Sequence, residues 1–248
     1  MKVLLVNGGP HKEGCTYTAL QEVAKTLNEE GIETEIFWIG IKPVGGCIAC
    51  KKCKELGRCV FNDVVNEFIE KAKEADGFIF GTPVHYAGAT GNMTGFMDRV
   101  FYAPFQSGKG DIFLFKPAAT VISARRAGTT ATYDQLNKYF GITQMPIISS
   151  RYWNMVHGAT PDDVRKDEEG MQVMRILGRN MAYYLKCIQA GKEKGIKLPE
   201  QEKINFTNFI RWIKLFNQSK LEIIRWIYAK EILIIGLISL FIEIKKKK

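Results

Sequence analysis

The chain has 248 residues, of which 46% are apolar and 25% are charged, a globular composition that excludes a disordered polypeptide and suits one or two domains. Its formal net charge is +9, and residues 212–248 hold eight Lys or Arg against three Glu. Because the preceding residues mix both signs and lack a basic stripe interleaved with aromatic side chains, we expect no nucleic-acid partner.

Strand and helix patterns alternate along most of the chain. The predicted strands are residues 2–7, 33–39, 77–81, 117–123 and 145–150, and the predicted helices are residues 16–30, 64–75, 94–102, 129–140 and 162–190. This alternation predicts an α/β domain on a five-stranded, doubly wound parallel sheet with helices on both faces. The first strand follows a single Lys without the longer apolar segment of a secretory signal, so we expect a cytoplasmic protein.

In a sheet of this kind, ligands bind beyond the carboxyl ends of the strands, near the point where the strand order reverses. The loop after the first strand is rich in glycine and leads into a helix whose first turn contains Thr16 and Thr18. Free N–H groups at a helix N-terminus attract anions, and His11 and Lys12 would add hydrogen bonds or charge. The alternative interpretation is a plain turn followed by a Thr N-cap.

Two further loops fall at the same edge of the predicted sheet. Residues 81–92 contain Tyr86 among glycines and other small residues, which suits a flat ring system. Residues 123–129 contain Arg125 and Arg126, which can meet a phosphate. Alternatively, Tyr86 packs on the next helix, and the arginines are solvated or pair with acids such as Asp134.

Four of the six cysteines cluster in one short segment, as Cys47, Cys50, Cys53 and Cys59. This compact spacing is typical of a 4Fe–4S cluster, and the neighbouring lysines would favour the thiolate forms. Zinc is one alternative, and reduced thiols or redox-active disulfides are another. Cys187 stands among apolar residues of a predicted helix and is expected to be buried.

The three loops together resemble the NAD(P)H-dependent FMN reductase group of flavodoxin-like proteins, and the cysteine segment resembles the iron–sulfur flavoprotein branch. Residues 152–158 and 207–211 also resemble segments of flavodoxin-family oxidoreductases. The resemblance covers about residues 1–211 and implies a flavodoxin-like FMN-binding domain with a cysteine-rich insertion at residues 45–60. It also implies a homodimer or homotetramer in which Trp153, Asn154 and His157 complete a neighbouring chain's site.

The resemblance further implies that FMN carries the chemistry, without a catalytic side chain. The implied phosphate contacts are Gly9, His11, Gly14, Cys15, Thr16 and Thr18. The implied isoalloxazine contacts are Pro83, Val84, His85, Tyr86 and Gly88, with Ser123, Arg125 and Gly128 closing over the ring. The implied metal ligands are Cys47, Cys50, Cys53 and Cys59. Gly9 stands where the family often has Ser, and His11 where it often has Arg, so part of the phosphate site is replaced or lost.

The predicted function is that of an FMN-dependent oxidoreductase, reduced by NAD(P)H and reducing a small acceptor such as a quinone, a free flavin or a metal species. One alternative is an iron–sulfur flavoprotein that carries electrons from ferredoxin. An alternative of another class is a cysteine-based redox sensor or ligand-binding module without turnover.

The composition changes after Arg211, where the resemblance stops. Residues 212–248 combine apolar and aromatic residues with lysines, and the apolar run 232–242 is too short to span a bilayer. This tail predicts either an interfacial helix on a membrane surface or an aberrant extension of the chain.

Overall fold

The computed structural model of the chain describes residues 1–108, 112–205 and 222–230. Its sheet has the order β2-β1-β3-β5-β6, with all of these strands parallel. The strands are β1 (Lys2–Asn7), β2 (Glu33–Trp38), β3 (Gly77–His85), β5 (Ala118–Ala124) and β6 (Met155–His157). A two-residue strand, β4 (Gly88–Ala89), pairs with the end of β3 in an antiparallel hairpin. The strand order reverses between β1 and β3, where this topology has its ligand crevice.

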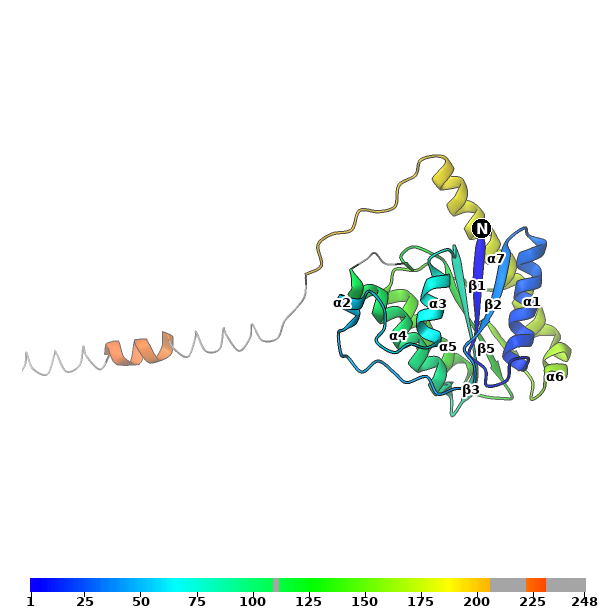
Figure 1. The fold of residues 1–248 in the computed structure, drawn as a ribbon, viewed down its shortest axis with the longest axis horizontal. Coiled ribbons are helices and arrows are strands. Elements are labelled where there is room, and N and C mark those ends of the chain that lie inside the picture. Colours follow the sequence, from blue (N-terminus) through cyan, green and yellow to red (C-terminus); the bar gives the residue numbers. More distant parts are fainter. Residues whose placement is uncertain (109–111, 206–221, 231–248) are drawn as a thin grey trace, which may run out of the picture. The chain divides into compact units, whose positions relative to one another are not determined.

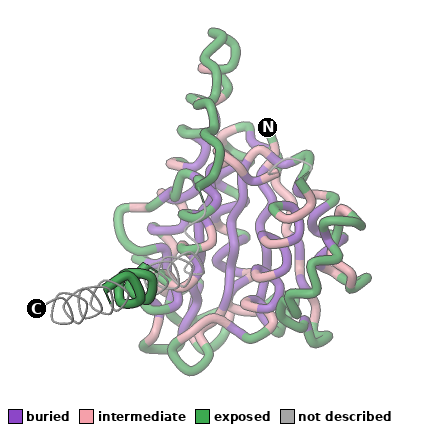
Figure 2. Tube along the Cα trace, turned by 90° about the vertical axis from the view of Figure 1, so that its left-hand side faces the viewer, coloured by how far each residue is buried: buried purple, intermediate pink, exposed green. Residues whose placement is uncertain are grey.

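Helices cover both faces of the sheet (Figure 1). One face carries α1 (Cys15–Glu29), α6 (Pro161–Lys166) and α7 (Glu168–Glu193), and the other carries α2 (Cys53–Leu56), α3 (Val64–Ala72), α4 (Gly91–Ser107) and α5 (Thr129–Ile142). Buried residues run along the central strands, and exposed residues lie on the outer helix faces and in loops (Figure 2). The predicted doubly wound parallel sheet is therefore confirmed, with β4 as an additional short strand.

Each helical layer buries its own apolar cluster against the sheet. On β3, Phe78 and Phe80 face the layer of α3, α4 and α5, whereas Ile79 faces the layer of α1 and α7. The ring of Phe68 on α3 lies 6.0 Å from that of Phe80 and 5.2 Å from that of Phe96 on α4. A strand that is buried on both faces must be apolar throughout, which explains the continuous run in β3.

The last parallel strand lies later in the chain than predicted. The prediction for residues 145–150 is wrong, because only Ile147 makes an isolated bridge there, to Ala118. The Asn154 side chain accepts a hydrogen bond from Ser150 N (3.1 Å) and donates one to Ile148 O (3.3 Å). These bonds fold residues 148–154 into a loop, and β6 forms after it.

The predicted helix 162–190 is two helices, α6 and α7, separated at Asp167. The Asp167 carboxylate accepts a hydrogen bond from Gly170 N at 2.9 Å, which caps α7, and another from His157 N at 2.6 Å. A short carboxylate that bonds nearby backbone ends one helix and begins the next. Similarly, α4 begins before its predicted start because the Thr90 hydroxyl accepts from Met93 N at 3.2 Å.

Contacts divide the chain into two units, Met1–Leu198 and Pro199–Lys248. In the second unit, residues 222–230 are helical and exposed. The predicted boundary between residues 211 and 212 and the apolar run 232–242 lie outside the described residues. Within the described part of the chain, no helix is both long and apolar enough to cross a membrane.

Candidate functional site

The loop between β1 and α1 is shaped by the buried side chain of Asn7, the last residue of β1. Its Oδ1 accepts a hydrogen bond from Gly9 N at 3.0 Å, and its Nδ2 donates one to Lys12 O at 3.0 Å. Trp38 Nε1 donates to Gly9 O at 2.9 Å from the end of β2. Asn7 is not among the predicted site residues, although Asn before Gly-Gly is a turn signal, because its side chain bonds the backbone two residues on.

The N-terminus of α1 opens at the same edge of the sheet. The N-cap residue of α1 is Gly14, and among the described residues no side chain caps this helix end. The first turn of α1 also contains no acidic residue. Its free N–H groups and the positive end of the helix dipole are therefore available to an anion. In this first turn, the hydroxyl oxygen of Thr16 lies 2.8 Å from that of Ser123, and this buried bond ties α1 to the end of β5.

A second wall is formed by the β3–β4 hairpin and the loop after β5. The hairpin tip consists of Tyr86 and Ala87, both with left-handed φ angles, 49° and 60°. Gly128 packs against the hairpin with φ 101°, and a Cβ on it would lie 2.8 Å from both Ala87 Cα and Val84 Cγ1. Glycine satisfies both this conformation and this spacing, whereas other residues would be strained.

These loops enclose an open cavity of about 310 Å³, a size typical of small-molecule sites. The predicted cofactor residues that line it are Gly9, His11, Gly14, Cys15, Thr16, Pro83, Val84, His85, Ser123 and Arg125. Pro10, Ala124, Gly158 and Ala159 line it as well. Gly158 and Ala159 follow β6, whose position was mispredicted, so the pattern of strands did not bring them to this edge.

Four predicted cofactor residues lie outside the cavity lining: Thr18, Tyr86, Gly88 and Gly128. Thr18 is buried in α1, and its hydroxyl donates to Gly14 O at 3.2 Å. Tyr86 projects from the hairpin tip and is fully exposed. Gly88 belongs to β4. Gly128 packs against Val84 and Ala87 of the hairpin, so it contacts the cavity wall although it does not line the cavity itself.

Cys15 contributes a thiol to the cavity. Its Sγ lies 3.8 Å from Gly158 O. Burial raises the pKa of this thiol, and the negative charge of Asp163 raises it further. A raised thiol pKa disfavours the thiolate, which is the nucleophilic form of cysteine.

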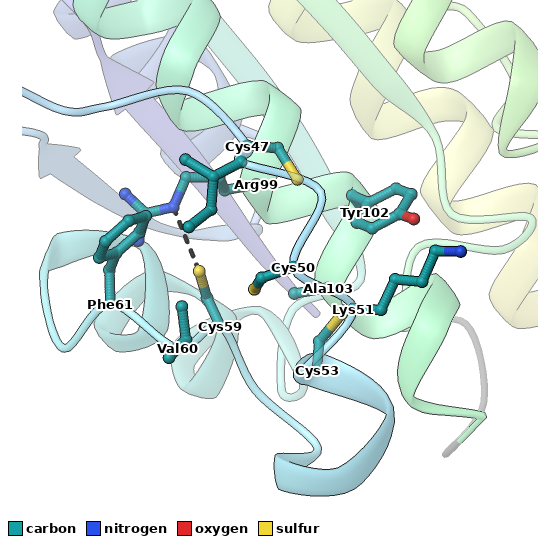
Figure 3. A pocket seen from close by; sticks show the side chains of 11 residues that line it. Cys47, Cys50, Lys51, Cys53, Cys59, Val60, Phe61, Arg99, Tyr102 and Ala103 are labelled. Carbon is teal, nitrogen blue, oxygen red and sulfur yellow. Dashed lines mark hydrogen bonds between the residues drawn. The ribbon is translucent and has the colours of Figure 1, made fainter.

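The four clustered cysteines line a second, smaller cavity, of about 20 Å³ (Figure 3). Cys53 is buried, Cys59 is half-buried, and Cys47 and Cys50 are exposed. Among the described residues, no group of three or more His, Cys, Asp or Glu side chains is arranged to hold a metal ion. The donor set nevertheless suits a metal, because residues 41–52 form neither helix nor strand and their sulfurs can approach Cys53 and Cys59 without breaking an element.

The cysteine segment, residues 44–63, packs on α4. A Cβ on Gly95 of α4 would collide with the carbonyl oxygen of Val44, so the backbones meet closely here. Arg99 of α4 is 2% exposed; its Nε donates to Cys59 Sγ at 3.2 Å, and its two Nη atoms each donate to Asp63 at 2.7 Å. Arg99 was not predicted as a site residue. The sequence pattern that could have identified it is the position of a charged residue, Arg99, about one helical turn after Phe96 on an otherwise apolar face of α4.

The thiols of this segment differ in their surroundings. Burial raises the pKa of the Cys53 thiol, and nearby Cys50 and Cys47 raise it further. Because a metal binds the thiolate form, binding of a metal at this site would release protons.

The prediction that Cys187 is buried is wrong. Cys187 is exposed on α7, on the side opposite the buried Leu185.

The residues expected to complete a neighbouring chain's site differ in exposure. The half-exposed ring of Trp153 lies 4.6 Å from that of Tyr152, and His157 Nδ1 lies 3.9 Å from Asp167 Oδ2. Asn154 is fully buried within this chain and bonds its own loop, which does not fit the predicted role.

Comparison with known proteins agrees with this architecture. Residues 1–160 match the family described as NADPH-dependent FMN reductase. An iron–sulfur flavoprotein of Methanocaldococcus jannaschii is 34% identical over 194 residues, which cover 76% of this chain and 100% of that protein. An iron–sulfur flavoprotein of Methanosarcina thermophila is 27% identical over 201 residues, which cover 78% of this chain and 100% of that protein.

Among solved structures, a WrbA-like flavodoxin from Agrobacterium tumefaciens aligns with a TM-score of 0.53 and 15% identity, covering 75% of this chain and 98% of that one. At this identity the likeness shows the fold alone, which is flavodoxin-like, as predicted. The family match covers more than half of the chain, and the Methanocaldococcus relative is covered along its whole length. This chain therefore belongs to the NADPH-dependent FMN reductase family of flavin-dependent oxidoreductases, and its relatives include iron–sulfur flavoproteins.

Proposed function

We propose that this chain is an iron–sulfur flavoprotein that binds FMN in the larger cavity, holds a 4Fe–4S cluster with its four clustered cysteines, and passes electrons from a protein donor to a small acceptor. The main supporting observation is that Cys47, Cys50, Cys53 and Cys59 line one cavity on α4. The N-cap of the same helix, Thr90, donates a hydrogen bond to Gly8 O at 3.2 Å, beside the larger cavity. The helix therefore connects the cysteine cavity to the loop that precedes Gly9 of the larger cavity.

The chemistry of the larger cavity suits FMN. The uncapped N-terminus of α1, with Thr16 and His11, suits the phosphate group. Pro83 and Val84 offer apolar contact to a flat ring, and Arg125 lies at the edge of the same cavity. Bound FMN supplies the hydride and one-electron chemistry, while these residues hold it in position and exclude water.

The chemistry of the cysteine cavity suits a 4Fe–4S cluster. Four thiolates from one compact segment are the ligands that such a cluster requires, and it supplies one-electron chemistry when bound. The names of the Methanocaldococcus and Methanosarcina relatives support iron over zinc or free thiols.

The surface around the cysteine cavity suits an acidic protein donor. Lys51, Lys52, Lys54 and Arg58 are exposed there, and Glu55 is the acidic residue between them. A cluster of one sign of charge steers a partner of the opposite sign and speeds association. We therefore propose a ferredoxin-type donor at this surface and a small acceptor, such as a quinone or a free flavin, at the flavin cavity.

A second candidate function is that of an NAD(P)H-dependent FMN reductase that reduces a small acceptor without the cluster. The family match over residues 1–160 favours it, since that family is described by its NADPH dependence. The two candidates differ in their electron donor and in their iron content.

The test is an anaerobic purification of the full chain followed by an absorption spectrum, iron, sulfide and FMN analysis, and reduction by ferredoxin or by NAD(P)H. We expect two flavin bands over a broad absorption that bleaches with dithionite, about four iron atoms per chain, and fast reduction by ferredoxin. Fast NAD(P)H oxidation by iron-free protein would support the second candidate. A protein that stays colourless after incubation with FMN would contradict both and leave a cysteine-based redox sensor or binding module.

We also propose a cytoplasmic homodimer or homotetramer. All six cysteines are free, as expected in a reducing compartment. The half-exposed rings of Tyr152 and Trp153 stand a few residues before Gly158 of the flavin cavity, and exposed aromatic side chains are enriched at subunit contacts. Light scattering of the purified chain and of W153A measures the oligomeric state and tests this contact.

A further inference from the structure

Arg99 is a fully buried cation whose donors are divided among three partners. Both Nη atoms donate to the Asp63 carboxylate at 2.7 Å, and Nη1 also reaches Gly45 O at 3.3 Å. The Nε atom donates to Cys59 Sγ at 3.2 Å (Figure 3). The guanidinium carbon lies 4.8 Å from the centre of the Phe61 ring. This arrangement satisfies a charge that would otherwise be costly to bury.

The bond to Cys59 is not needed to neutralise Arg99. The fork of Nη atoms already pairs with the carboxylate in a bidentate manner, which is the strongest geometry for this ion pair. The remaining Nε–H has a fixed direction, because the planar guanidinium is held by Asp63 on one side and by Phe61 on its face. It therefore presents one donor to one sulfur of the cysteine cavity.

A fixed N–H donor acts on the charge of a thiolate sulfur. One-electron reduction of an iron–sulfur centre increases the negative charge on its sulfur ligands, so a hydrogen bond to such a sulfur strengthens on reduction. Hydrogen bonds to the sulfurs are among the factors that set cluster reduction potentials. Because the ion pair with Asp63 has no net charge, the directed N–H makes the main contribution of Arg99 at Cys59.

We propose that Arg99 is a positioning residue of the four-cysteine site: its Nε–H holds the Cys59 sulfur and makes one-electron reduction at that site more favourable. This inference rests on the proposed function, since the cysteines must hold a 4Fe–4S cluster. In the reduction, one electron leaves the protein donor and one electron enters the site, and no proton or covalent bond is exchanged.

The test is a mediated redox titration of the anaerobically purified full chain with FMN and cluster bound, followed by EPR and visible absorption. R99K keeps a positive charge near Asp63 but lacks the Nε–H. We expect an approximately tenfold loss in the equilibrium constant for one-electron reduction, a downward shift of about 59 mV. The matched variant D63N keeps the Nε donor and an α3 cap, because Asn also caps helices, but removes a negative charge. We expect its potential to shift upward.

A merely structural anchor predicts a different result, in which R99K loses thermal stability and its potential does not shift. An unshifted potential in R99K with full iron content overturns the role of Arg99 while the proposed function stands. Folded R99K without iron also overturns it, in favour of anchoring alone. Wild-type protein that binds no iron overturns the cluster and the role of Arg99 together. If R99K does not fold, the double variant R99M/D63N takes its place, because it lacks the Nε–H and removes both charges of the ion pair together; an unshifted potential in that variant contradicts the inference.

Discussion

The hydroxyl oxygens of Thr16 and Ser123 lie 2.8 Å apart and are buried, although 107 positions separate them in the sequence. The bond joins the first turn of α1 to the carboxyl end of β5. Both residues line the larger cavity, so the bond holds the N-terminus of α1 against the strand that leads to Arg125.

Loss of this bond should weaken FMN binding. In T16V both partners lose a hydrogen bond, and a buried bond contributes about 1 kcal/mol, which corresponds to about fivefold in affinity. The measurement is quenching of flavin fluorescence as apoprotein is titrated into FMN. The control is T26V, on the same helix, where the Thr26 hydroxyl donates to Glu22 O away from the cavity. Equal FMN affinity for T16V and T26V would remove Thr16 from the binding site.

Substitution of a clustered cysteine should remove iron but not flavin. We expect C53S to lose most of its iron and sulfide and the broad visible absorption, because Cys53 is a buried member of the cysteine cavity. C187S changes an exposed cysteine of α7 and should retain the wild-type iron content. Metal analysis and spectra of both variants check this. An iron content in C53S equal to that of C187S would show that the cavity is not the cluster site.

Gly128 should be intolerant of a side chain. G128A combines a φ of 101° with a Cβ 2.8 Å from Ala87 Cα, so we expect a loss of about 2 to 4 kcal/mol in the free energy of unfolding, from strain and overpacking together. The matched control is G31A, where φ is 78° but no atom lies within 4 Å of the added Cβ. Urea denaturation should show a smaller loss, of about 1 kcal/mol, for G31A. Similar losses in both variants would mean that the hairpin yields to the new Cβ.

The ion pairs of Glu35 give a pH-dependent contribution to stability. Lys2 and Lys71 each lie 2.8 Å from a Glu35 oxygen, and their hydrogen bonds, Lys2 first, lower the pKa of this carboxyl. A lowered folded-state pKa stabilises the fold above the ordinary Glu value of about 4.3, and this contribution is lost as the pH falls through the folded-state pKa.

E35Q should therefore be less stable than the wild type at pH 7, by less than about 1 kcal/mol because the pair is partly exposed. The difference should vanish in acid. Thermal unfolding of both proteins from pH 7 to pH 3 measures it, and a difference that is constant across this range would contradict the pairing.

The chain's own pattern determined the layered architecture. Apolar strands that alternate with amphipathic helices bury their faces as a parallel sheet that is covered on both sides. This alternation can be recognised from the spacing of apolar residues along the chain. The glycine-rich turn at Gly9 and Gly14, the loops after β3 and β5, and the cysteine spacing are also local features. They identified ten of the fourteen residues that line the larger cavity and the four cysteines that line the smaller one.

The tertiary structure alone decided the contacts between distant segments. Asn154 bonds Ser150 N and Ile148 O, which a strand at residues 145–150 would have used, so β6 forms later and Gly158 lies at the larger cavity. Arg99 reaches Cys59 only because α4 and the cysteine segment pack closely at Gly95. Such pairings depend on how whole elements meet in space, and local propensity and spacing along the chain contain no information about that.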